Sequence, residues 1–112
     1  QAEFFALEGL SQLLKTIDRV KINLNPKLEI RGVLLTMFDK RNKLSSQVEM
    51  EARKFLNEKV YQTVIPRNVR LSEAPSNGVP ILVYDKFCNG SKSYSNFAEE
   101  FLKQENLMES AA

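Results

Sequence analysis

VIPRNVRLSEAPS, residues 64–76, is the stretch of sequence that decides the fold. It begins in a β-branched run, and Pro66 ends that run as a strand because proline cannot donate a hydrogen bond to a neighbouring strand. Asn68 is a good N-cap for the helix that follows, and Pro75 with Gly78 closes this helix within about two turns. In a parallel α/β sheet, such a strand-to-helix turn lies at the carboxyl edge, where ligands bind.

A helix and a strand are predicted at the start of the chain. Apolar residues recur at helical spacing from Leu7 to Ile17, and residues 23–26 end this helix with two asparagines and a proline. A strand is predicted over residues 28–37. Its centre, Val33–Leu35, is continuously apolar, which is typical of a strand buried on both faces.

The other elements are a second helix, a second strand and a C-terminal helix. Ser46 and Glu49 have the spacing of a capping box for the second helix, and Val60–Ile65 is the second strand. Residues 80–84 are predicted to be extended, and Ser91 to cap the last helix. The order strand–helix–strand with short loops predicts a right-handed crossover between parallel strands. Since the apolar first strand needs neighbours on both sides, the pattern favours part of a larger α/β domain.

The composition excludes several classes of site. The 112 residues are 43% apolar and 27% charged, which is typical of a globular chain. The net charge of +2 argues neither for nor against nucleic-acid binding. There is no histidine and one cysteine, Cys88. Disulfide frameworks, zinc sites and histidine-based triads are therefore excluded within the chain. No stretch is long enough to span a membrane.

The chain also lacks the residues of a phosphate-binding loop, which needs clustered glycines, a lysine and a following helix. The four glycines are isolated, and none precedes a Lys-Ser or Lys-Thr pair. Asp39 follows the first strand but lies in a basic loop, where turn capping or pairing with Lys40 or Arg41 is its expected role. We therefore assign no catalytic residue and no metal ligand in this chain, and expect it to be inactive alone.

Two basic clusters follow the two predicted strands. Lys40, Arg41 and Lys43 follow the first strand, and Arg67 and Arg70 follow the second. If the strands are parallel neighbours, both loops emerge at one sheet edge and lie within about 10–15 Å of each other. The clusters are then either an ordinary solvated rim or a surface for phosphate groups. Aromatic residues are not interleaved with them, so backbone-phosphate contact is the form of nucleic-acid binding that they support.

Three stretches of the chain resemble, in order and spacing, the C-terminal half of the ParA/Soj family of chromosome- and plasmid-partitioning ATPases. They are QAEFFALEGL at residues 1–10, GVLLTMFDKR at residues 32–41, and residues 64–76 followed by Gly78, Pro80 and Tyr84-Asp85. The resemblance implies an α/β fold: residues 1–112 would be the C-terminal part of a single P-loop NTPase domain, a parallel sheet with flanking helices. The N-terminal half, with its P-loop, would be absent.

In that family, a deviant Walker ATPase binds ATP and Mg²⁺, closes into a dimer and binds DNA non-specifically, and a ParB protein triggers hydrolysis. By position, the resemblance implies that Arg41 and Arg70 contact DNA and that Pro66, Arg67 and Asn68 lie beside the adenine. ATP and Mg²⁺ are expected in the intact parent and not on this chain alone. Whether the chain belongs to an active enzyme stays open.

The resemblance further implies a cytoplasmic, nucleoid-associated protein with three partners: DNA, a ParB-like protein and a second copy of itself. We expect no membrane partner. Two alternatives remain, a related deviant-Walker ATPase with another cargo and a free-standing basic DNA-binding module. The site residues have simpler alternatives too. Arg70 could pair with Glu73 across one helical turn, and Pro66 and Asn68 could be only a strand stop and a helix cap.

Overall fold

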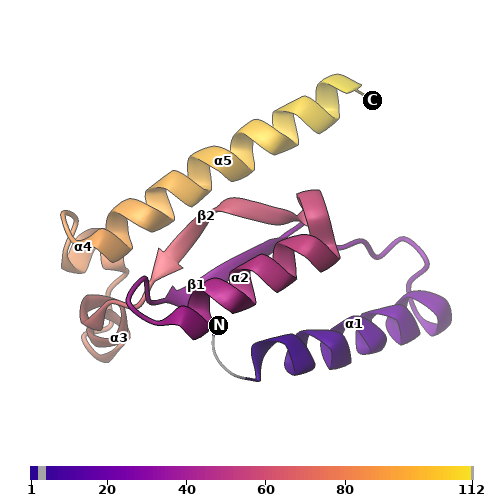
Figure 1. The fold of residues 1–112 in the computed structure, drawn as a ribbon. Helices are drawn as coiled ribbons and strands as arrows, with labels where there is room; N and C mark the ends of the chain where they lie inside the picture. Colours follow the sequence, from indigo (N-terminus) through magenta and orange to yellow (C-terminus); the bar gives the residue numbers. More distant parts are fainter. Residues whose placement is uncertain (3–4, 112) are drawn as a thin grey trace.

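The chain folds as a two-stranded parallel sheet flanked by helices, in a computed structural model that describes residues 1–2 and 5–111 (Figure 1). This confirms the predicted fold class. The elements in chain order are α1 (Ala6–Asn23), β1 (Val33–Phe38), α2 (Lys43–Leu56), the 3₁₀ turn η1 (Asn57–Lys59), β2 (Val60–Pro66), α3 (Val69–Ser76), α4 (Ile81–Tyr84) and α5 (Asn89–Ala111).

The two strands pair in parallel, but neither runs evenly. Val33 pairs with Val60 and Leu35 with Val64, so β2 uses four residues where β1 uses two, and β2 bulges between these pairs. The last pair is Phe38 with Pro66. Before it, β1 carries Met37 at a φ of 53°, in the left-handed region that non-glycine residues rarely adopt. Because the strands are parallel, the loops that follow them emerge at the same edge of the sheet.

The helices divide between the two sides of β2. One core lies between α1, α2 and the sheet and includes Leu35, Phe38 and Val48. On the other side, α5 runs along β2 (Figure 1) and packs Phe97 and Phe101 against the buried Tyr61, with the Tyr61 and Phe97 rings edge-to-face at 4.9 Å between centroids.

The bulge of β2 is held by two charged side chains. The Glu100 carboxylate, on α5, accepts the backbone N–H groups of Gln62 at 2.7 Å and Thr63 at 2.8 Å. The Arg53 guanidinium, on α2, donates to the carbonyl oxygens of Val60 and Gln62 at 3.4 Å each. These contacts give hydrogen-bond partners to backbone groups of residues 60–63, the stretch of β2 in which the register shifts.

The edge of β1 that faces away from β2 is less covered than the backbone of β2. Within residues 1–2 and 5–111, no further strand lies on this side. The Ala2 N–H donates to the Thr36 carbonyl oxygen at 2.9 Å, and the Ala2 carbonyl accepts the Ser45 hydroxyl at 3.1 Å. This edge therefore already accepts one backbone hydrogen bond from the N-terminal residues.

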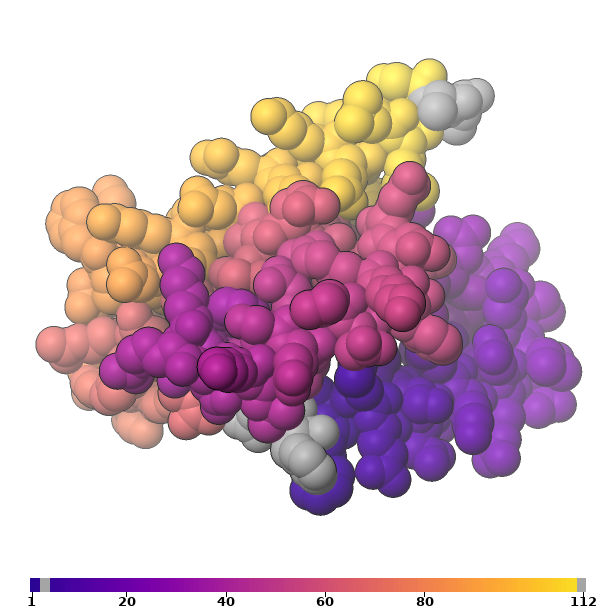
Figure 2. Space-filling model, viewed as in Figure 1, coloured from indigo at the N-terminus to yellow at the C-terminus, as the bar shows by residue number. Residues whose placement is uncertain are grey.

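Helix α1 is loosely packed for its length. It contains no fully buried residue, and it forms a lobe (indigo to violet) set apart from the sheet in the space-filling view (Figure 2). Its exposed apolar side chains include Leu13 and Ile22, and Leu24 follows directly after it. Such a surface is typical of a helix whose apolar face has no partner yet.

Four local predictions are wrong. Residues 28–32, predicted as the start of the first strand, precede β1, which begins at Val33. Helix α2 begins at Lys43 and is capped by the Asn42 side chain, which accepts the Leu44 N–H at 2.9 Å, so Ser46 lies inside the helix. Residues 81–84 form the helical turn α4 instead of an extended segment, because the Pro80 carbonyl accepts the N–H groups of Val83 and Tyr84. Helix α5 begins at Asn89, before Ser91, whose N–H donates to the Cys88 sulfur.

Candidate anion-binding groove

The two basic loops meet at the carboxyl edge of the sheet, as predicted. The Arg67 N–H donates to the Phe38 carbonyl oxygen at 3.0 Å, which ties the end of β2 to the end of β1. The loop after β1 thus lies beside the turn that leads from β2 into α3. Both loops border one groove.

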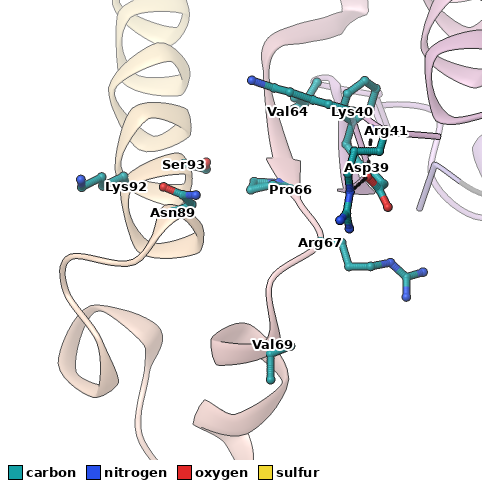
Figure 3. A pocket seen from close by; sticks show the side chains of 11 residues that line it. Asp39, Lys40, Arg41, Val64, Pro66, Arg67, Val69, Asn89, Lys92 and Ser93 are labelled. Atoms are coloured by element: carbon teal, nitrogen blue, oxygen red, sulfur yellow. Dashed lines mark hydrogen bonds and ion pairs between the residues drawn. The ribbon is translucent and has the colours of Figure 1, made fainter. Parts of the chain in front are cut away.

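This groove has a volume of about 620 Å³ and three walls (Figure 3). The first wall is the loop after β1, the second is the end of β2 with the start of α3, and the third is the first turn of α5. Its lining residues are Phe38, Asp39, Lys40, Arg41, Val64, Pro66, Arg67, Val69, Asn89, Lys92 and Ser93. Four of them are cationic and one is anionic, so the groove carries a positive charge and suits an anionic ligand.

The one carboxylate in the groove is already paired. Asp39 Oδ1 accepts the Arg41 backbone N–H at 3.0 Å and lies 3.3 Å from Arg41 Nε. The two hydrogen bonds from Arg41, first from its backbone and then from its side chain, lower the pKa of Asp39. This confirms the predicted pairing of Asp39 in its turn. The Arg41 side chain is 91% exposed, so the pair leaves most of its guanidinium accessible to a ligand.

A second hollow, of about 320 Å³, adjoins the groove on the other side of the turn after β2. Pro66, Arg67 and Asn68 line it together with Met37 of β1 and Tyr94 of α5. The Asn68 side-chain oxygen accepts the Arg70 N–H at 2.9 Å, so the predicted helix cap is confirmed. Pro66 ends β2 as predicted. The three residues predicted for the adenine side therefore share one hollow at the carboxyl edge.

Arg70 does not line the groove but belongs to a charged network between α3 and α4. Its guanidinium lies 3.4 Å from carboxylate oxygens of both Glu73 and Asp85, and the Tyr84 hydroxyl donates to Glu73. The hydrogen bond with Tyr84, followed by the charge of Glu73, raises the pKa of Arg70. Pairing with Glu73, the simpler of the two roles considered for Arg70, is thus present. The side chain is still 53% exposed.

Sequence reasoning missed the third wall of the groove. Asn89, Lys92 and Ser93 have the spacing of neighbours on one helix face, and this was the available signal. What the sequence could not supply was the docking of α5 along β2, which brings that helix turn to the sheet edge.

Two other kinds of site are missing from the described part of the chain. Residues 1–2 and 5–111 contain no cluster of three cysteine, aspartate or glutamate side chains that could hold a metal ion. None of the helices in these residues is long and apolar enough to cross a membrane.

Comparison with known proteins identifies a family for most of the chain. Residues 3–81 match the family described as the CobQ/CobB/MinD/ParA nucleotide binding domain. The chromosome partitioning protein ParA of Caulobacter vibrioides is 58% identical over 105 residues, which are 94% of this chain and 39% of that protein. The sporulation initiation inhibitor protein Soj of Bacillus subtilis is 56% identical over 89% of this chain and 40% of its own length.

A chromosome-partitioning ATPase Soj from Thermus thermophilus is 48% identical over 91% of this chain and 41% of its own length. The chain thus spans about two fifths of the length of these relatives. The resemblance that the three sequence stretches indicate is confirmed.

Proposed function

Because the chain belongs to the CobQ/CobB/MinD/ParA family of nucleotide-binding domains, we propose that it acts in chromosome or plasmid partitioning as part of a ParA/Soj-type ATPase. The identity to partitioning proteins, 48–58% over nearly the whole chain, supports this proposal over a cargo of another kind. In this proposal an ATP-gated dimer binds DNA without sequence preference.

The basic groove is the observation that carries the DNA-binding part of the proposal. Arg41 lies on its rim with a mostly exposed guanidinium, and Arg70 lies half-exposed on α3, which begins at the same sheet edge. Guanidinium groups bind phosphate oxygens with two parallel hydrogen bonds, whatever the base sequence. These two arginines are therefore proposed as contacts to the DNA backbone.

The hollow beside the groove carries the nucleotide-binding part. We assign Pro66, Arg67 and Asn68 to the adenine side of an ATP site whose Mg²⁺ and phosphate ligands are not among residues 1–112, because these residues include no glycine-rich loop. Proline and the main chain around it offer a flat apolar wall for a base, and the asparagine amide offers hydrogen bonds to its edge. In the proposal, a ParB-like protein triggers hydrolysis, and the protein works in the cytoplasm on nucleoid DNA.

Replacing either Arg41 or Arg70 by alanine is expected to weaken DNA binding about equally on unrelated sequences. Each loss removes one phosphate contact, so the slope of log K against log salt should fall by about 1. Fluorescence anisotropy with two duplexes of unrelated sequence, over a range of salt concentrations, measures both quantities.

Arg19→Ala is the matched control for this experiment. Arg19 is an exposed arginine on α1, which lies away from the groove (Figure 1), and its replacement should leave binding unchanged. A variant at Arg41 or Arg70 that changed sequence preference, or that bound like the control, would count against the assignment of that residue.

We also propose that the chain associates with a second copy of itself through the open edge of β1. No further strand of residues 1–2 and 5–111 pairs with this edge, which lies beside partly buried apolar side chains, and edges of this kind pair with other strands. The bond between the Ala2 N–H and the Thr36 carbonyl supports the choice of edge, since a backbone group from outside the sheet reaches it.

Sedimentation velocity at micromolar concentration is expected to show a dimer or a larger species. Thr36→Pro should shift the chain toward monomer, because proline removes a backbone donor from the edge strand and leaves the pairing with β2 intact. A monodisperse wild-type monomer would show that β1 does not pair with a second copy.

A further inference from the structure

The first turn of α5 lies across the groove from the basic loop after β1, and the proposed function leaves it without a role. Asn89, Lys92 and Ser93 line the groove from this side. Figure 3 shows Asn89 and Ser93 directed toward β2, whereas the Lys92 side chain projects from the other side of the helix. The groove is thus cationic on the loop side and offers neutral hydrogen-bond donors on the helix side.

We propose that this turn of α5, the third wall of the groove, takes part in DNA binding, with Asn89 and Ser93 donating hydrogen bonds to backbone phosphates that Lys40 and Arg41 neutralise from the loop after β1. This inference rests on the proposed DNA-binding function and adds a surface to it. Amide and hydroxyl side chains are frequent phosphate contacts in protein–DNA interfaces, next to arginine and lysine. They fix the path of the backbone without reading sequence.

The shape and charge of the groove favour a backbone over a single small anion. Its cations are spread over separate elements, since Lys40 and Arg41 are in the loop after β1, Arg67 follows β2 and Lys92 is on α5. A compact phosphate site would gather donors around one point, typically with glycines that let the main chain approach. No glycine lines this groove, and its floor is apolar, with Phe38, Val64 and Pro66.

A duplex fits this arrangement because its phosphates are also spread. One strand carries a phosphate every 3.4 Å or so along the helix axis, so several can lie within one groove. The carboxylate that could repel them, Asp39, is paired with Arg41. The loop side therefore offers positive charge to the phosphates, and the helix side offers them hydrogen-bond donors.

The test places a carboxylate on the α5 wall without disturbing the helix. Asn89→Asp is isosteric, and an acidic residue in the first turn of a helix is favoured by the helix dipole, so the thermal melting temperature should not fall. A charge placed within several ångströms of bound phosphates should weaken binding about fivefold at low salt, and less as salt screens it. Ser93→Asp should give the same result as a second variant.

The matched controls carry the same changes outside the groove. Asn106→Asp lies about 25 Å further along α5 at the rise of an α-helix, and Ser95→Asp lies on a different face from Ser93. The affinity of each variant for a fluorescein-labelled duplex and for a fluorescent ATP analogue would be measured by anisotropy, with Arg41→Ala alongside.

The proposal expects the groove variants to bind the duplex more weakly than both controls. If they bind like the controls while Arg41→Ala is weakened, the α5 wall is not a DNA contact, although the proposed function stands. If Arg41→Ala also binds normally, the DNA-binding function itself fails. A loss confined to the ATP analogue would make the groove a nucleotide site and would equally overturn the inference.

Discussion

Tyr61→Ala is expected to lower the free energy of unfolding by about 3–5 kcal/mol, the range for removing a large buried aromatic side chain. Tyr61 is 5% exposed and joins α5 to the sheet through its contacts with Phe97 and Phe101. A small domain is stable by only about 5–15 kcal/mol, so this one change should remove a fifth or more of the stability and lower the urea midpoint clearly. Urea unfolding followed by circular dichroism measures the loss.

Two further substitutions separate the packing of Tyr61 from its other properties. Tyr61→Phe keeps the ring and should cost no more than about 1 kcal/mol, the worth of one hydrogen bond. Gly32→Ala should cost about 1–3 kcal/mol, because a Cβ at Gly32 would lie 2.4 Å from the Tyr61 ring. Gly9→Ala is the control, since no atom lies within 4 Å of its Cβ, and should stabilise α1 by about 0.5–1 kcal/mol. A mild Tyr61→Ala variant would mean that α5 is not anchored here.

Glu100→Ala is expected to cost about 1.5–3 kcal/mol, because it leaves the N–H groups of Gln62 and Thr63 without their charged acceptor. The neighbouring Glu99→Ala changes an exposed carboxylate of the same helix and should stay within about 0.5 kcal/mol of wild type. Equal effects of the two changes would show that the bulge of β2 does not depend on Glu100.

The same carboxylate predicts how stability depends on pH. Partial burial opposes ionisation of Glu100, but hydrogen bonds from Thr63 and Gln62 outweigh it and lower the pKa of Glu100. A carboxyl with a lowered pKa stabilises the fold above its unfolded-state value and loses that contribution as the pH falls through its folded-state value. Wild type should therefore lose stability below about pH 4.3 more steeply than Glu100→Ala. Parallel curves for the two proteins would contradict this.

The sequence predicted the elements that depend on local pattern. The apolar stripe of α1, the existence of β1 and the proline that ends β2 follow from spacing and residue type alone. The predicted burial of Val33–Leu35 on both faces holds only for Leu35, since Val33 and Leu34 are partly exposed. The sequence did not predict features that depend on contacts with other segments of the chain. Asn42 and Ser46 are both good caps, and the packed structure uses Asn42. The segment Ile81–Tyr84 is apolar and could equally be a strand from its sequence, but it forms a helical turn.

The candidate site divides in the same way. The two basic loops could be placed at one edge because parallel strands end together. Of the five basic residues predicted there, Lys40, Arg41 and Arg67 share the groove, whereas Lys43 and Arg70 do not line it. The contacts of Arg70 with Asp85, and the approach of Asn89 and Ser93, link segments that only the packed structure brings together. No periodicity within one segment carries that information.

The unequal edges of the sheet limit what this chain can build from copies of itself. Fibrils grow because each added molecule presents another unpaired strand edge to the next molecule. Glu100 and Arg53 already form hydrogen bonds with backbone groups of β2. The outer edge of β1 is therefore the main edge left for pairing with another strand. When two copies pair through β1, the β1 edges of both copies are occupied, and the pair is closed. If the chain pairs through β1 as proposed, a closed pair should therefore be the main associated species, and open-ended growth through the sheet is not expected.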